Sequence, residues 1–391
     1  MNPPASISII GTTNARRPFQ RFGMRQSDRL HHLYVIGKTG TGKSTLLESL
    51  ALQDIRAGRG VAVIDPHGDL AERLMGQILD ERRASVRYLD APNLSQPYGY
   101  NPLRGVRADL IPLAASGLME AFKKLWADAW GPRMEHIYRQ TLYALLEYGK
   151  AHLPDVLRML DDPAFRTQVL GRVKNEQVRA FWLREFPKYN QRYRQEAMAP
   201  IQNKVGAFLA DPRLYRLFTA PPIDLRFRRV MDQQEILIIN LAKGSLGEDS
   251  ANLLGALLVT TLGLAGLSRA DLPNDERADF FLYIDEFQSF TTLSMANMVS
   301  ELRKFRVGLV LAHQHLHQLE NDVRHAVLGN VGSIIAFRVG VEDAPTLAKE
   351  FAPIFDPDDL ALLSNHHIYV KMMIDGAPSR PFSATTLRPA P

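Results

Sequence analysis

The segment from Gly37 to Thr45 constrains the fold more than any other part of the sequence. It reads GKTGTGKST and matches G-x-x-x-x-G-K-[ST], the pattern of a loop that cradles the phosphates of a nucleotide. The apolar run 33–36 precedes it and predicts a buried strand, and leucines at roughly helical spacing follow from Leu46. Because a strand, a glycine turn and a helix in this order point backbone N–H groups at an anion, the sequence predicts a nucleotide site in an α/β fold.

Each residue type in this loop has a role in phosphate binding. Glycines let the backbone approach the phosphates, the ammonium of Lys43 neutralises the β- and γ-phosphates, and the hydroxyl of Ser44 is a ligand for Mg²⁺. The predicted nucleotide contacts are Gly37, Thr39, Gly40, Thr41, Gly42, Lys43, Ser44 and Thr45.

A second apolar run, 280–284, ends in two acids. At the carboxyl end of a strand, Asp285 is predicted to complete the Mg²⁺ site opposite Ser44, and Glu286 is predicted to orient and polarise the attacking water. These acids indicate hydrolysis as well as binding. Gln314 follows the strand 307–312, which we place between the strands of Lys43 and Asp285, and it is a candidate γ-phosphate sensor; alternatively, it merely ends the strand.

The segment from about 104 to 219 has a different character. Apolar residues recur every three or four positions, which predicts amphipathic helices. These helices are expected to start or break at Pro132, Pro154, Pro163, Pro187 and Pro200. We therefore predict an all-α domain, 104–219, inserted into an α/β domain built from 1–103 and 220–391. The second part is predicted to end in a β-hairpin closed by Asp375-Gly376.

Positive charge is concentrated in this middle region. The net charge of the chain is +5, whereas residues 104–230 contain 22 Lys and Arg against 13 Asp and Glu. A polyanion or an acidic partner is one explanation, and a solvated helical surface is the other. The segment 181–194 interleaves aromatics with cations, so Arg184, Lys188 and Arg192 are candidate DNA contacts; alternatively, the aromatics pack in the core. Lys243, in the polar loop 243–248, is a further candidate if that loop lines a pore.

Two absences limit the class of protein. There is no cysteine, which excludes a disulfide framework, a thiolate zinc site and a cysteine nucleophile. The longest apolar run, 253–267, is shorter than the roughly 18–20 residues that span a bilayer, and the N-terminus has no signal-peptide pattern. We expect a soluble, cytoplasmic protein without an integral membrane segment.

The ordered motifs resemble those of the HerA/FtsK superfamily and, within it, the TraG/TraD-like coupling proteins of type IV secretion and conjugation. The motifs are GKTGTGKST, VIDPHGDL, YGYNPL, LYIDEFQSF, ELRKFRVGLVLAHQ and NVGSIIAFRVG. The resemblance covers most of the chain from Phe22 onward, and it implies a hexameric ring of RecA-like domains that hydrolyse ATP with Mg²⁺ at subunit interfaces and drive DNA through the pore. Separately, Arg303, Arg324 and Arg338 are candidates for an arginine finger that reaches a neighbour's γ-phosphate; alternatively, these arginines cap helices or make surface ion pairs.

The sequence departs from the family in two respects. Membrane-anchored coupling proteins begin with transmembrane helices that are not seen here, and the roughly 30 residues before the phosphate loop are too few for the N-terminal β-barrel of the HerA repair proteins. We expect an ATP-driven DNA translocase. The alternatives are a motor of the same fold that moves or assembles protein components of a secretion apparatus, and a non-motor, ATP-switched adaptor that recruits a relaxase or nuclease.

Overall fold

The central sheet is mostly parallel, as predicted. The structure is a computed structural model that describes residues 7–15, 19–127, 130–219 and 222–387. Within them, eleven strands form one sheet in the order β2-β1-β15-β12-β11-β3-β10-β9-β4-β8-β5. The parallel part comprises β11 (Ser333–Ala336), β3 (Leu33–Ile36), β10 (Val307–His313), β9 (Phe280–Ile284), β4 (Gly60–Asp65), β8 (Ile236–Asn240) and β5 (Val86–Asp90). Six of these strands are buried at every position, which explains why they read as uninterrupted apolar runs.

The two ends of the chain extend this sheet on one side. Four antiparallel strands are added: β12 (His367–Lys371), β15 (Phe382–Thr386), β1 (Ile7–Thr13) and β2 (Arg21–Arg25). The short strands β13 (Met373–Ile374) and β14 (Ala377–Pro378) close the hairpin between β12 and β15 around the turn Asp375-Gly376.

Helices cover both faces of the sheet, and two apolar clusters mark the two interfaces. On one face, α2 (Lys43–Arg56) and α3 (Asp69–Gln77) pack on the strands. On the other face lie α12 (Phe227–Asp232), α14 (Glu248–Ser268), α15 (Leu293–Leu302) and α16 (Asn321–Asn330). The remaining helices of the body are short: α1 (Gln26–Arg29), α4 (Asp80–Arg83), α13 (Lys243–Leu246), α17 (Ala344–Phe351) and α18 (Pro357–Leu362).

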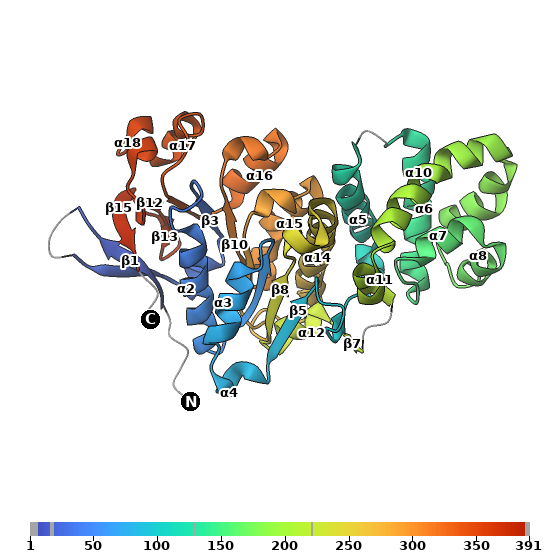
Figure 1. Cartoon of the computed structure of the whole chain (residues 1–391), viewed down its shortest axis with the longest axis horizontal. Helices are drawn as coiled ribbons and strands as arrows, with labels where there is room; N and C mark the ends of the chain where they lie inside the picture. The colour runs from blue at the N-terminus through green and yellow to red at the C-terminus, as the bar shows by residue number, and fades with distance from the viewer. Residues whose placement is uncertain (1–6, 16–18, 128–129, 220–221, 388–391) are drawn as a thin grey trace.

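A lobe of helices stands beside this α/β body, coloured from teal through green to yellow-green in Figure 1. It contains α5 (Ile111–Leu125), α6 (Pro132–Tyr148), α7 (Asp155–Asp161), α8 (Pro163–Leu170), α9 (Glu176–Ala180), α10 (Gln191–Leu209) and α11 (Pro212–Thr219). The chain enters through β6 (Tyr98–Gly99) and leaves through β7 (Ile223–Asp224), and these two strands pair with each other. The predicted boundary at 219/220 adjoins residues 220–221, which lie outside the described residues.

Prolines mark the helix ends less strictly than the sequence suggests. Pro132 and Pro163 begin α6 and α8, as predicted. Pro200 lies inside α10, so the break predicted there is wrong. Ala197 and Ile201, on the same helix near Pro200, are buried in the lobe, and their packing offsets the loss of one backbone hydrogen bond at the proline.

The most apolar helix belongs to the core of the body. Within the described residues, the segment Glu248–Asp271, which contains α14, is the one helical segment long and apolar enough to cross a membrane, and 83% of its most apolar window is buried inside the protein. It packs against α5 and α15. Its composition is therefore accounted for by its position between the sheet and the lobe.

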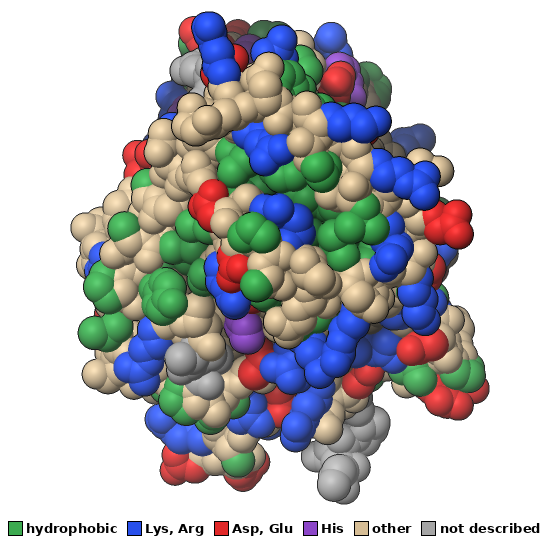
Figure 2. Space-filling model, turned by 90° about the vertical axis from the view of Figure 1, so that its right-hand side faces the viewer, with side chains coloured by type: hydrophobic (Ala, Val, Ile, Leu, Met, Phe, Trp, Pro, Cys, Tyr) green, Lys and Arg blue, Asp and Glu red, His purple; other side chains and the backbone are tan. Residues whose placement is uncertain are grey.

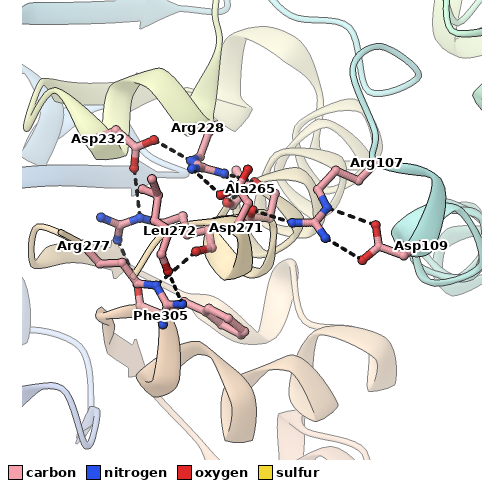
Figure 3. Close-up of polar contacts among 11 residues, drawn as sticks. Arg107, Asp109, Arg228, Asp232, Ala265, Asp271, Leu272, Arg277 and Phe305 are labelled. Atoms are coloured by element: carbon pink, nitrogen blue, oxygen red, sulfur yellow. Dashed lines mark hydrogen bonds and ion pairs between the residues drawn. The ribbon is translucent and has the colours of Figure 1, made fainter. Parts of the chain in front are cut away.

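A polar cluster ties the start of the lobe to the edge of the body where β8 and β9 begin (Figure 3). Arg107 pairs with Asp109 at 2.9 Å and donates to the carbonyl of Ser268, at the end of α14, at 3.0 Å. Arg228 of α12 donates to the same carbonyl at 2.7 Å and pairs with Asp271 at 2.8 Å. The entry segment is thus anchored to the C-terminal end of α14.

A buried ion-pair network joins the phosphate-loop helix to β9. Asp54 of α2 is fully buried and accepts from Arg29 at 2.6 and 2.8 Å, from Arg59 at 2.8 Å, and from the hydroxyl of Tyr283 at 2.5 Å. Burial alone would raise the pKa of Asp54, but the positive charge and hydrogen bonds of Arg29, with the charge of Arg59, outweigh it and hold the pKa below its usual value.

Replacing this carboxylate is expected to be costly. Asp54→Asn should lower the free energy of unfolding by about 3–5 kcal/mol, because it leaves the buried guanidinium of Arg29 without its counter-ion. Chemical denaturation followed by circular dichroism measures this. Asp80→Asn is the matched control, since Asp80 pairs with Arg83 and its side chain is 98% exposed. Equal stability of the two variants would contradict the prediction.

Candidate active site

The predicted functional residues converge where β3, β10 and β9 end. β10 pairs with β3 on one side and with β9 on the other, which confirms the predicted position of the Gln314 strand between the other two. The backbone N–H of Gly37, the first residue of the loop, donates to the carbonyl of His313 at 3.3 Å. The carboxyl ends of neighbouring parallel strands are where α/β proteins bind their ligands.

The glycines of the phosphate loop are required by its conformation. Gly40 and Gly42 have φ values of +75° and +121°, which residues with a side chain rarely adopt. At Gly37, a Cβ atom would lie 2.5 Å from the Cβ of Phe337, so the space there also excludes a side chain. The loop therefore needs glycine at all three positions to start α2 directly after the turn.

Lys43 points back across this loop. Its ammonium donates to the carbonyls of Gly37 at 2.6 Å and Lys38 at 3.2 Å. Burial lowers the pKa of Lys43, while the negative charges of Glu286 and Asp285 oppose that shift. The ammonium thus lies in the electrostatic field of both the predicted Mg²⁺ ligand and the predicted catalytic acid.

Three threonines complete the set of predicted loop contacts. Thr41 is buried, and its hydroxyl donates to the carbonyl of Lys38 at 2.7 Å. Thr39 is exposed, and Thr45 is half-buried in the first turn of α2. The structure brings all the predicted loop residues to one edge of the sheet, and their contacts with a nucleotide remain a prediction.

A hydroxyl and a carboxylate from different elements meet beside the loop. Ser44 Oγ donates to Asp285 Oδ2 at 3.0 Å, and the N–H of Glu286 donates to Asp285 Oδ1 at 3.0 Å. Burial, followed by the neighbouring charge of Glu286, raises the pKa of Asp285. Within the described residues no three His, Cys, Asp or Glu gather around a metal position. Two oxygen ligands fit Mg²⁺, because this ion is usually held by one or two protein groups together with phosphate oxygens and water.

Two amide side chains hold Glu286 in place. Gln314 donates to Glu286 Oε1, and Gln288 donates to Glu286 Oε2 at 2.6 Å. The hydroxyl of Thr39 donates to Gln314 Oε1 at 2.7 Å, so a hydrogen-bonded chain runs from the phosphate loop to the acid. Glu286 itself has a φ of +48°, a conformation that commonly marks functional positions in non-glycine residues.

Sequence reasoning missed Gln288. Its amide lies two residues after the predicted water-activating acid, and this spacing in LYIDEFQSF is the signal that was available. The side chain reaches back only because residues 287–289 form a single 3₁₀ turn after the strand.

The three candidate arginines do not all lie at the same edge of the sheet. The carbonyl of Arg338 accepts from the N–H of Lys38 at 2.8 Å, so Arg338 adjoins this chain's own phosphate loop. Arg324 lies in α16, downstream of Gln314 at the same edge. Arg303 precedes β10 and is exposed at the opposite edge. Of the three, Arg303 is therefore the one placed away from the chain's own nucleotide site.

The candidate DNA contacts are all found at least partly accessible. Arg184, Lys188 and Arg192 are exposed on the lobe, and Arg192 pairs with Glu196 at 2.9 Å. The interleaved Phe181, Trp182 and Phe186 are buried, so the core-packing alternative holds for them. Lys243 is half-buried at the start of α13, where the sequence predicted an open loop.

Figure 2 views the molecule from the side of the lobe. Lys and Arg side chains gather over the lower and right-hand parts of this face, among fewer acidic ones. The segment 104–230, which includes the lobe, carries the excess of positive charge counted from the sequence. A positively charged face attracts a polyanion electrostatically, and dissolved salt limits the range of this attraction to about 10 Å.

Known proteins share this fold. The family described as "Helicase HerA, central domain" matches residues 26–260. The bacterial conjugative coupling protein TrwBdeltaN70, in its unbound form, aligns with a TM-score of 0.68 and 17% identity, over 94% of this chain and 87% of that chain. The plasmid coupling protein TrwB in complex with ADP and Mg²⁺ gives 0.67 and 17%, over 94% and 88%.

VirB4 of Thermoanaerobacter pseudethanolicus is also similar. It aligns with a TM-score of 0.65 and 13% identity, over 98% of this chain and 96% of that chain. No curated protein matches the sequence. At these identities the structural likeness establishes a shared fold, and it confirms the predicted class of an α/β nucleotide-binding body with an all-α insertion.

Proposed function

The chain belongs to the family of the HerA central domain, as a HerA/FtsK-type P-loop ATPase that resembles the conjugative coupling proteins, and we propose that it is an ATP-hydrolysing ring motor that translocates DNA. The observation that carries the proposal is the hydrogen-bonded set of Ser44, Asp285, Glu286 and Gln314 around one strand edge. Binding alone would not require a glutamate held by two amides next to the Mg²⁺ ligands.

Each residue of the set has a role in this reaction. The phosphate loop and Lys43 bind the ATP phosphates. Ser44 and Asp285 would hold Mg²⁺, and the ion would neutralise charge that develops on the phosphates. Glu286 orients the attacking water and accepts its proton, and Gln314 connects Glu286 to Thr39 so that the acid responds to the γ-phosphate. TrwB in complex with ADP and Mg²⁺ supports the choice of both cofactors.

A head-to-tail ring agrees with the positions of the arginines. In such a ring one edge of each subunit faces a different edge of its neighbour. Arg303 lies at the edge opposite the chain's own phosphate loop, so we assign it as the finger that completes the neighbour's site. We further propose a homo-hexamer, the domain division 1–103, 104–219 and 220–391, and a cytoplasmic location, where ATP and DNA are both available.

The positive face of the lobe is the proposed DNA-contacting surface. Arg184, Lys188 and Arg192 present exposed cations, and Lys243 is proposed to contact phosphates from the body. Such contacts neutralise phosphates without reading sequence, as a translocase requires.

ATP hydrolysis with and without DNA tests this function. The purified protein is expected to hydrolyse ATP several-fold faster with single- or double-stranded DNA, and the stimulation should weaken with rising salt because it depends on phosphate contacts. Joint replacement of Arg184, Lys188 and Arg192 by alanine should reduce the stimulation and leave the basal rate unchanged. Slow turnover that is indifferent to both forms of DNA would contradict the proposal and favour a protein-directed motor or an adaptor.

A further inference from the structure

The last turn of α5 reaches from the lobe to the loop that follows the catalytic acids. The ammonium of Lys124 donates to two backbone carbonyls of this loop, that of Gln288 at 2.5 Å and that of Thr291 at 2.8 Å. α5 is also the helix of the lobe that packs against α14 and α15 of the body. One helix thus belongs to both parts of the molecule.

A second contact holds the other end of the same loop. Glu120, one turn before Lys124 on α5, accepts a hydrogen bond from the N–H of Ser294, in the first turn of α15, at 2.7 Å. The approach of the helix is close, because a Cβ at Gly117 would lie 2.6 Å from Thr260 of α14. Residues 288–294 are therefore held by α5 at both ends, by the ammonium of Lys124 at one end and by the carboxylate of Glu120 at the other.

This loop carries the side chain that holds the water-activating acid. The backbone of Gln288 is fixed by Lys124, and its amide donates to Glu286 Oε2 at 2.6 Å. The loop is also seated on the body, since a Cβ at Gly255 of α14 would lie only 2.2 Å from the ring of Phe290. An unbroken series of contacts therefore runs from α5 through Gln288 to Glu286.

The ammonium of Lys124 also interacts electrostatically with the segment that follows β10, the strand of Gln314. Lys124 is an exposed residue, but its ammonium lies against the carbonyls of Gln288 and Thr291, and partial burial of the ammonium lowers the pKa of Lys124 to about 8. The charge of Glu320 opposes this shift, and Glu320 lies just before α16, downstream of Gln314. Lys124 thus contacts the loop that follows β9 and also feels the negative charge of the segment that follows β10.

We propose that Lys124 is a positioning residue that couples the helical lobe to hydrolysis by holding the loop 288–294, and through Gln288 the carboxylate of Glu286, in the productive position. The proposal rests on the assignment of Glu286 as the water-activating acid. When ligand binding shifts the lobe, α5 and Lys124 displace the loop 288–294 and so change the position of Glu286. The nucleotide-binding residues need not move.

Lys123 provides a matched control for the test. It lies on the same helix and carries the same charge, but its ammonium is 3.7 Å from Glu135 within the lobe. Lys124→Met is expected to lower kcat for ATP hydrolysis about tenfold with KM and nucleotide affinity unchanged, because misplacing a catalytic group slows chemistry more than binding. Lys123→Met should resemble the wild type, and Lys124→Arg should restore most of the loss.

Amide hydrogen exchange gives a readout that does not depend on turnover. Without nucleotide, residues 286–294 should exchange at least several-fold faster in Lys124→Met than in Lys123→Met, with the same thermal midpoint in both. If Lys124→Met does not fold, Glu120→Ala releases the other end of the loop and should give the same changes.

The outcomes separate the two proposals. Equal exchange in Lys124→Met and Lys123→Met, or a loss that appears in KM, overturns the positioning role. If residues 286–294 exchange faster in Lys124→Met but DNA does not change the ATPase rate of the wild-type protein, the positioning role of Lys124 stands and only the DNA motor is overturned. A response to DNA that is unchanged in Lys124→Met would overturn the coupling even if the motor is correct.

Discussion

Glu286→Gln is expected to abolish steady-state ATP hydrolysis while ATP binding stays close to the wild-type value. The amide has nearly the same shape as the carboxylate but cannot take a proton from water, and removal of a general base costs about 10²–10⁴-fold in rate. It also alters the hydrogen bonds from Gln288 and Gln314, because a single amide oxygen replaces two carboxylate oxygens. Phosphate release measures turnover, and titration with a fluorescent ATP analogue measures affinity.

The control for this variant is an acid away from the site. Glu301→Gln changes the same functional group in the last turn of α15, where Glu301 pairs with Lys304 at 2.7 Å. It should keep the wild-type rate. If Glu286→Gln retained more than about a tenth of that rate, another residue would activate the water and the proposed roles would be wrong.

Lys43→Ala is expected to remove most of the affinity for ATP. The ammonium supplies the charge that neutralises the phosphates, and it also ties the loop by its bonds to Gly37 and Lys38. The loss of a charge-assisted contact of about 3 kcal/mol corresponds to a dissociation constant raised roughly a hundredfold. Direct titration with the fluorescent analogue in the presence of Mg²⁺ measures this change.

Lys38→Ala provides the comparison for charge alone. Lys38 lies in the same loop, but its side chain is exposed and its carbonyl, which the substitution retains, accepts the bond from Lys43. A much smaller loss is expected. Similar losses in the two variants would show that general electrostatic attraction, and not the buried position of Lys43, determines the affinity.

The parts of the molecule that sequence could predict are those in which local pattern and tertiary position agree. Buried parallel strands read as continuous apolar runs, so the strands of Lys43, Asp285 and Gln314 and their relative order were correct. The phosphate loop was also predictable, because its positive φ angles require glycine at Gly40 and Gly42, and these glycines are visible in the sequence.

What sequence could not predict depends on contacts between distant residues. Lys124 meets Gln288 across 164 positions of the chain, and nothing near Lys124 indicates that partner. The sequence also does not show that Arg303 and Arg338 lie at opposite ends of the parallel strands. The break predicted at Pro200 failed because tertiary packing outweighed a local preference.

The pairing of β6 with β7 has a consequence for how this architecture can diversify. The chain leaves the body through β6 and returns through β7, with Tyr98 opposite Ile223, so the two covalent connections of the lobe lie side by side. Its outer helices can be lengthened, exchanged or lost without rethreading a single strand of the sheet. α5 is the exception, because it is also part of the wall of the body. Relatives that bind a different ligand through the lobe are therefore expected to differ in α6 to α11 and to preserve α5.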